Sequence, residues 1–182
     1  MERYGGGAIS VVDYDPAWPE MFEQERANLK SMLGSLVFTI EHMGSTAVPG
    51  LASKPIIDLL VGVYSLADAR SRCIEPFQAS GYAYIPEYES WLPDELFFRK
   101  GGPGPWTHHV HVMESSNPRW DAFLTFRDYL RGHPDAASAY GKLKKSLAAE
   151  FKDDIAGYRN AKDDFIVAAM VNARRRPRID PY

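Results

Sequence analysis

The sequence contains a single cysteine, Cys73, among 182 residues. An intrachain disulfide is therefore excluded, and so is a zinc site built from several thiolates. Apolar runs are also short, and none approaches the ~18 residues of a membrane-spanning helix. The opening residues, MERYGGGAIS, are too polar for a signal peptide. We therefore expect a cytoplasmic protein that does not interact with membranes.

An excess of positive charge is lacking as well. The formal net charge is −3 and the isoelectric point is near 6.0. Proteins that bind nucleic acid without regard to sequence need a basic face, so broad nucleic-acid binding is not expected. One short basic run stands near the C-terminus and is interpreted as a solvated tail; it comprises Arg174, Arg175, Arg176 and Arg178.

Hydrophobic periodicity and turn residues predict alternating helices and strands. Helices are expected from Asp15 as N-cap to Gly34 and over residues 65–80, 118–131, 135–151 and 158–175. Strands are expected over residues 9–12 (a short edge strand), 36–43, 56–63, 82–85, 96–100 and 108–113. This order predicts an α/β (α+β) fold with a mixed β-sheet flanked by helices and a helical C-terminal third. We expect one domain over residues 1–182, with a core at about 9–115 and the helical part at about 118–176.

A glycine turn directly follows the strand at 36–43. Gly44 allows a phosphate to approach the backbone closely, while Ser45 and Thr46 offer hydroxyl groups and amide donors. The turn therefore suits an anion. A tight turn that only ends the strand is the alternative interpretation.

Asp58 is a single carboxylate within the otherwise apolar strand at 56–63, which is expected to be central and buried on both faces. An unpaired charge buried there would cost several kcal/mol. Asp58 is therefore expected either to face a cleft and bind a metal, or to form a structural ion pair. Hard oxygen ligands suit Mg²⁺ in phosphoryl transfer.

The segment THHVHVM places His109 and His111 on one face of a strand, with His108 on the other. Two imidazoles on one face suit metal binding or general acid–base catalysis. A polar, solvated sheet face is the alternative. Val110 and Val112 indicate that the opposite face is core, so the histidine pair is expected to face a groove or solvent.

Three basic residues are candidates for phosphate contacts. Arg99 lies between bulky apolar residues on a strand and would either clamp a phosphate or neutralise Asp58 or Glu41. Lys54 and Lys162 are weaker candidates, and Lys162 also fits an ordinary surface lysine.

Several ordered blocks of the sequence resemble the GrpB family, a group of small bacterial proteins with a nucleotidyltransferase-like fold. The blocks are VVDYDPAWPEMFEQE at 11–25, EHMGSTAVPGLASKPIIDLLVGV at 41–63, GYAY at 81–84, HHVHV at 108–112, FRDYLRGHPDAASAYGKLKKSLA at 126–148 and YRNAKDDFI at 158–166. The resemblance covers most of the chain. Members of the family occur alone and, in some bacteria, fused to dephospho-coenzyme A kinase.

The resemblance implies a nucleotidyltransferase-like site that departs from the usual pattern. In the superfamily a Gly-Ser turn precedes a strand with two acids one position apart, and a neighbouring strand carries a third acid. Gly44 and Ser45 match the turn, Asp58 matches the first acid, and Leu60 stands at the second acid position. A divalent ion, Mg²⁺ or Mn²⁺ or a transition metal, would then be held by Asp58 with Glu41, His109 and His111.

Three functions follow as hypotheses. The first is metal-dependent transfer of a nucleotidyl group from a nucleoside triphosphate to a small-molecule acceptor. In it Asp58, His109, His111 and Arg99 would be catalytic, while Gly44, Ser45, Thr46, Lys54, Arg99 and Lys162 would bind phosphates. The second is a non-catalytic module that binds a nucleotide or a coenzyme A-related ligand. The third is a metal-dependent enzyme of another class with a His/His/carboxylate site. A homo-oligomer is compatible with each.

Overall fold

The computed structural model describes residues 9–102 and 105–175. Five strands form one mixed sheet in the order β1-β2-β5-β4-β3, so that β5 is its centre. The strands are β1 (Val37–Met43), β2 (Ile57–Val63), β3 (Tyr82–Tyr84), β4 (Leu96–Lys100) and β5 (His108–Glu114). Strands β2 and β5 are parallel, whereas the other neighbours are antiparallel. The mixed sheet predicted from the sequence is confirmed.

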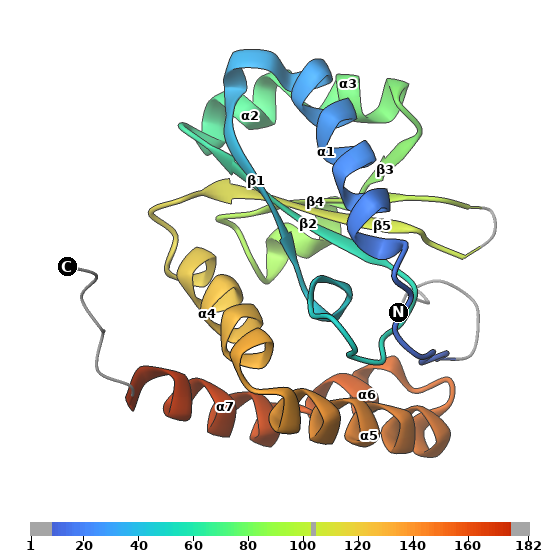
Figure 1. The fold of residues 1–182 in the computed structure, drawn as a ribbon. Coiled ribbons are helices and arrows are strands. Elements are labelled where there is room, and N and C mark those ends of the chain that lie inside the picture. The colour runs from blue at the N-terminus through green and yellow to red at the C-terminus, as the bar shows by residue number, and fades with distance from the viewer. Residues whose placement is uncertain (1–8, 103–104, 176–182) are drawn as a thin grey trace.

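Helices α1 (Trp18–Leu33), α2 (Leu66–Arg72) and α3 (Ile74–Ala79) lie together on one face of this sheet (Figure 1). The largest apolar core fills the space between them and the strands. It includes Leu29 and Phe77 from the helices and Leu59, Val61 and Val110 from the sheet. The alternation of strand side chains between faces places these residues together.

The helical C-terminal third comprises α4 (Pro118–Gly132), α5 (Pro134–Phe151), α6 (Ile155–Asn160) and α7 (Asp163–Arg175). Helix α4 packs on the second sheet face, where Leu60 and Met113 contact Trp120. Helices α5, α6 and α7 lie beyond the sheet, next to the loop between β1 and β2 (Figure 1). Val48 and Leu51 of that loop join a core with α4 and α5. The β1–β2 loop is thus held between the sheet and the helical third.

Three predicted elements differ from the structure. The helix expected over 65–80 is two helices that meet at Cys73, because Pro76 has no N–H to continue the hydrogen-bond ladder. The helix expected over 158–175 is α6 and α7, separated by Ala161 and Lys162. The edge strand expected over 9–12 is an isolated bridge from Val12 to Ser53.

Smaller differences concern element ends. Helix α1 begins at Trp18, and Asp15 instead accepts a hydrogen bond of 2.9 Å from the Ala17 amide before the helix begins. Short 3₁₀ helices occupy Gly34–Leu36, Ser45–Ala47 and Pro86–Ser90, three segments that the sequence predicts partly or wholly as loop. Arg176 and Arg178 of the basic run lie outside the described residues.

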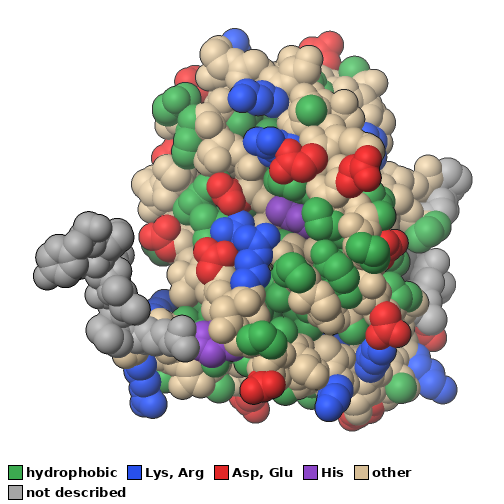
Figure 2. Space-filling view, viewed as in Figure 1, with side chains coloured by type: hydrophobic (Ala, Val, Ile, Leu, Met, Phe, Trp, Pro, Cys, Tyr) green, Lys and Arg blue, Asp and Glu red, His purple; other side chains and the backbone are tan. Residues whose placement is uncertain are grey.

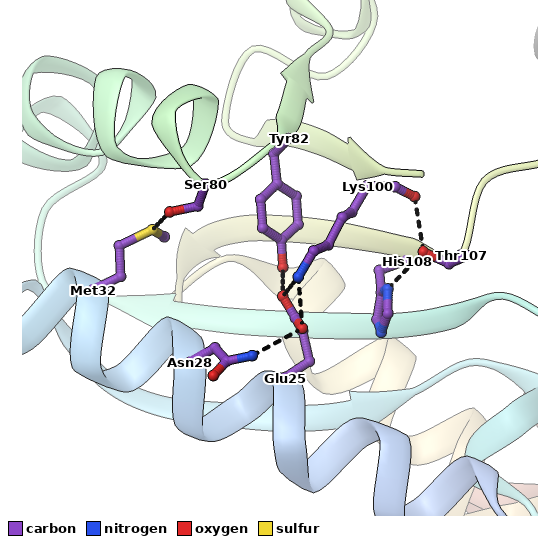
Figure 3. Close-up of polar contacts among 8 residues, drawn as sticks. All are labelled: Glu25, Asn28, Met32, Ser80, Tyr82, Lys100, Thr107 and His108. Carbon is purple, nitrogen blue, oxygen red and sulfur yellow. Dashed lines mark hydrogen bonds and ion pairs between the residues drawn. The ribbon is translucent and has the colours of Figure 1, made fainter. Parts of the chain in front are cut away.

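A partly buried ion pair links α1 to β4, next to the edge strand β3 (Figure 3). Lys100 Nζ lies 2.7 Å and 2.9 Å from the two carboxylate oxygens of Glu25, and the Tyr82 hydroxyl also donates to Glu25. His108 points into the same face, as predicted from its place on the strand. This cluster lies on the sheet face opposite to Asp58, because Asp58 pairs with His109 across the ladder.

Within the described residues, no helix has the length and apolar character needed to cross a membrane. Basic and acidic side chains are interspersed over the face shown in Figure 2, without a broad field of one sign there. Such a mixed surface agrees with the net charge of the sequence.

Candidate active site

The register of the sheet brings three of the predicted site residues into one row. Asp58 on β2 is opposite His109 on β5, and His109 is opposite Arg99 on β4. Because directly paired residues point to the same face, all three side chains lie on the face that α4 covers in part. The row begins at Met43 on β1, which is opposite Asp58 and directly precedes the glycine turn.

Asp58 and His109 form a close pair. The Nδ1 atom of His109 lies 3.2 Å from Oδ1 of Asp58, and the Asp58 side chain is 26% exposed. Burial favours the neutral acid, but the hydrogen bond and charge of His109, with His111 and Lys54 nearby, hold the pKa of Asp58 below its usual range. Burial lowers the pKa of His109 despite Asp58. The neutral ring donates from Nδ1, which leaves Nε2 as an acceptor.

Gly44 lies directly against this carboxylate. Its φ angle is +71°, in the region that favours glycine, and an added Cβ would be only 2.3 Å from Oδ2 of Asp58. A glycine is therefore required here for two separate reasons. The turn and the acid form one local unit, although fourteen positions separate them in the chain.

Of the two hydroxyl residues after Gly44, Thr46 has a structural role. Its Oγ1 lies 3.0 Å from Nε2 of His42 and donates to the Ile56 carbonyl at 3.3 Å, and the residue is only 1% exposed. These two bonds engage the Thr46 hydroxyl within the fold, and its predicted phosphate contact stays a prediction. Ser45 begins the short 3₁₀ helix and is partly exposed, so it remains the hydroxyl candidate.

His111 belongs to a different pair from the one expected. Its Nδ1 is hydrogen-bonded to Glu95, a carboxylate that is completely buried and that also binds Arg119 of α4. Burial opposes ionisation of Glu95, but His111 and Arg119 together hold its pKa below the usual value. His111 is itself buried rather than facing an open groove. Glu95 was missed from the sequence because it lies in the polar segment before β4.

Glu41 is also engaged elsewhere. Its carboxylate lies 2.9 Å from Arg127 of α4, which in addition donates to the carbonyl of His42. Among the described residues, no group of three or more His, Cys, Asp and Glu side chains is arranged to hold a metal ion. The four predicted ligands, Asp58, Glu41, His109 and His111, are therefore not brought together as one set.

Basic side chains from several elements interact electrostatically with Asp58. Lys54 of the β1–β2 loop and Lys162, between α6 and α7, both lie close enough for the charge of Asp58 to favour their protonated forms. Burial nevertheless dominates, lowering the pKa of Lys54 and lowering that of Lys162 to about 8. Lys144 of α5 joins them and was missed, because an Ala- and Lys-rich helix predicts a solvated face.

Arg99 is buried beside the same row. Its guanidinium carbon lies 5.2 Å from the ring centroid of Phe97 and 5.6 Å from that of Trp106. Its charge reaches both Lys54 and His109, lowering the pKa of each beyond the effect of burial. Arg99 thus contributes to a positive potential around Asp58.

Comparison with known proteins identifies the family of the chain. A family model described as "GrpB protein" matches residues 8–172. The chain belongs to the GrpB family. A GrpB-family relative, the UPF0157 protein YqkA of Bacillus subtilis, is 42% identical over 92% of the chain. The chain spans 48% of the length of that Bacillus protein. A second relative, the glutamate-rich protein GrpB of Alkalihalophilus pseudofirmus, is 33% identical, and the match covers 88% of this chain and 92% of that protein.

Two solved structures place the GrpB fold among known ones. The crystal structure of the conserved protein GrpB from Enterococcus faecalis has a TM-score of 0.82 and 42% identity, covering 90% of this chain and 96% of that one. Terminal uridylyl transferase 4 from Trypanosoma brucei, with bound CTP, has a TM-score of 0.50 at 12% identity, covering 90% of this chain and 52% of that one. The second likeness concerns the fold alone, and it agrees with the nucleotidyltransferase-like class predicted from the sequence.

Proposed function

We propose that this GrpB-family protein transfers a nucleotidyl group from a nucleoside triphosphate to a small-molecule acceptor. One observation carries the proposal: a single carboxylate, Asp58, lies against the Gly44 turn, in one row with Arg99 and within electrostatic reach of Lys54 and Lys162. Such a site combines an acid for a hard cation with basic groups for phosphates. The fold shared with a uridylyl transferase supports this class of reaction.

The donor set fits one divalent ion and does not fit a two-metal centre. Mg²⁺ bound through one carboxylate, water and substrate phosphates needs no complete protein cage, so Asp58 with the hydroxyl of Ser45, which follows Gly44, would suffice. Leu60 occupies the place of a second acid and is fully buried in apolar contacts. A bound ion would supply neutralisation of phosphate charge.

The protein's own side chains would then position the reactants and stabilise the negative charge on the phosphate groups. Arg99 and Lys54 would stabilise the negative charge that develops on the transferred and leaving phosphate groups. His109, held by Asp58 through Nδ1, presents Nε2 as the acceptor for a proton of the attacking group. In-line attack requires orientation of the reactants more than a strong base.

The test is release of pyrophosphate from each nucleoside triphosphate with a pool of small metabolites, in Mg²⁺ and in Mn²⁺. Asp58→Asn is expected to lower turnover by at least about a hundredfold. Asp121→Asn, an exposed carboxylate on α4, is the matched control and is expected to retain activity. Absence of pyrophosphate release in both metals, while nucleotide still binds, would contradict the proposal.

A second function is supported by two observations: Leu60 at the second acid position and the relatives among dephospho-CoA kinases. The dephospho-CoA kinase of Mycolicibacterium paratuberculosis is 29% identical over 85% of this chain, which spans 43% of that protein. We infer as the alternative a module that binds a nucleotide or a coenzyme A-related ligand without turnover. Calorimetry distinguishes the two, because binding that is unchanged in Asp58→Asn and in the absence of metal supports the module.

A further inference from the structure

Lys144 carries a buried amine that forms no hydrogen bond with any described residue. The residue is 3% exposed, and Nζ has no hydrogen-bond partner within the described part of the chain. Its nearest described aromatic contact is the Tyr140 ring, whose centroid is 4.8 Å from Nζ. A buried lysine in this state destabilises the fold, and a lysine with a purely structural role usually extends its amine to water.

Neighbouring charges increase the free-energy cost of burying the protonated Lys144 amine. Lys162 and Lys54 repel its protonated form, and Asp58 is the group that favours it. Lys162 in turn lies over the buried Tyr158, with Nζ 4.4 Å from the ring centroid, and its protonated form is disfavoured by Arg159 as well as Lys54. Three lysines, from a loop, from α5 and from the α6–α7 connection, thus interact with one another. Among the described acids, only Asp58 and Asp163 favour their protonated forms.

We infer that Lys144, Lys162 and Lys54 form the binding site for a polyphosphate chain, next to Asp58. The inference rests on the proposed function in that it names the part of the substrate that the helical third would bind. A di- or triphosphate carries several negative charges along its length, which match amines that come from separate elements. Asp58 and Asp163 together carry only two negative charges for these three amines.

The geometry also explains why the helical third packs against the β1–β2 loop. Tyr140 and Phe165 stack with ring centroids 4.7 Å apart, and both belong to the core that α4 and α5 form with Val48 and Leu51. This core fixes α5 and α7 relative to the loop that carries Lys54. The backbone segments that carry the three amines are therefore positioned before any anion binds, which reduces the entropic cost of binding.

The experiment is calorimetric titration of the full chain with sodium tripolyphosphate in EDTA, without nucleotide. Wild-type protein is expected to bind, and Lys144→Met is expected to bind at least about tenfold more weakly. Lys162→Met, at a less buried position, is expected to bind about fivefold more weakly. Lys142→Met changes an exposed lysine on the same helix and is the matched control, expected to bind within about twofold of wild type.

Two results would overturn the inference: no binding of tripolyphosphate by the wild type, or equal affinities for wild type, Lys144→Met and Lys162→Met. Cooperative unfolding of the Lys144→Met variant would establish that this variant is folded. If it is not folded, the binding measurement on Lys162→Met tests the inference instead. The titration contains neither metal nor acceptor. Binding without any pyrophosphate release in the turnover assay would therefore support the phosphate site while contradicting nucleotidyl transfer.

Discussion

At the scale of single residues, Asp58 and Gly44 depend on each other. The carboxylate occupies the space that a Cβ at position 44 would need, and the positive φ of Gly44 directs the chain away from β1 into the turn. Neither requirement is local in sequence. An acid in one apolar strand and a glycine at the end of another strand thus form a single structural unit.

Gly44→Ala is expected to destabilise the protein by roughly 3 kcal/mol or more, because the positive φ and the clash with Asp58 both oppose it. Gly50→Ala is the matched control. Gly50 also has a positive φ, +76°, but an added Cβ would meet nothing within 4 Å, so a loss of about 1 kcal/mol is expected. Urea denaturation measures both values. Equal losses in the two variants would show that contact with Asp58 does not matter.

Lys144→Met is expected to raise the free energy of unfolding at pH 7 by about 2 to 4 kcal/mol. Burial, with the charges of Lys162 and Lys54, lowers the pKa of Lys144 to about 7 from 10.5, although Asp58 opposes the shift. A basic group whose pKa is lowered in the folded state reduces the free energy of unfolding most at pH values below that pKa. This loss of stability disappears as the pH rises toward 10.5, the pKa of an unperturbed lysine.

The gain from Lys144→Met should accordingly be largest at pH 6 and become small by pH 10. Denaturation of both proteins across this range provides the measurement. The buried Tyr140 faces Lys144 and titrates only at higher pH, since burial raises its pKa. A gain that does not change with pH would mean that the lysine is not the titrating group.

At the scale of secondary structure, Glu95 connects three elements. It lies just before β4, accepts from His111 on β5 and binds Arg119 near the start of α4. Asn117, the N-cap of α4, accepts a hydrogen bond from the Arg119 amide at 2.9 Å and donates to the Asp94 carbonyl at 3.3 Å. The beginning of α4 is thus tied to the segment before β4.

Glu95→Gln is expected to lower the free energy of unfolding by roughly 1 to 3 kcal/mol at pH 7, because His111 and Arg119 lose a buried anion. The pKa of Glu95 is lowered in the folded state, so its contribution is present above 4.5 and is lost as pH falls below that value. Wild type and variant should therefore become more alike in acid. Glu87→Gln, at an exposed position, is the control in the same denaturation series.

At the scale of the whole molecule, the candidate site lies where the sheet, the β1–β2 loop and the helical third meet. The sheet contributes Asp58, His109 and Arg99, the loop contributes Gly44 and Lys54, and the helical third contributes Lys144 and Lys162. A ligand bound there would contact parts of the chain that otherwise pack through a small core of their own.

Tripolyphosphate is therefore expected to slow amide hydrogen exchange several-fold in residues 44–55 and 140–163, because it joins the loop to the helices. Residues 66–79, in α2 and α3 on the opposite sheet face, serve as the internal reference and should not change. Mass spectrometry of the exchanged peptides measures both segments. Equal slowing throughout the chain would indicate general stabilisation rather than a site.

The strands and the faces of their side chains could be predicted from the sequence. Strand β4 was predicted at its observed bounds, and β1, β2 and β5 were predicted within one residue at each end. His109 and His111 were placed on one face, and His108 on the other, because alternation along a strand depends only on local geometry. The link between Asp58 and His109 came from the family resemblance. Breaks within helices were predicted less well, since Pro76 and the connection at Lys162 were both read as helix interior.

The sequence by itself therefore determined the family, the mixed sheet, and the Gly44 turn and Asp58 as the centre of the candidate site. The tertiary structure decided which charges are partners: Arg127 for Glu41, Glu95 for His111, and Lys144 beside Lys54 and Lys162. The physical reason is that strand alternation follows from the backbone of a few residues. The burial and pairing of a charge depend instead on helices that are distant in the chain and reach the site only in the folded protein.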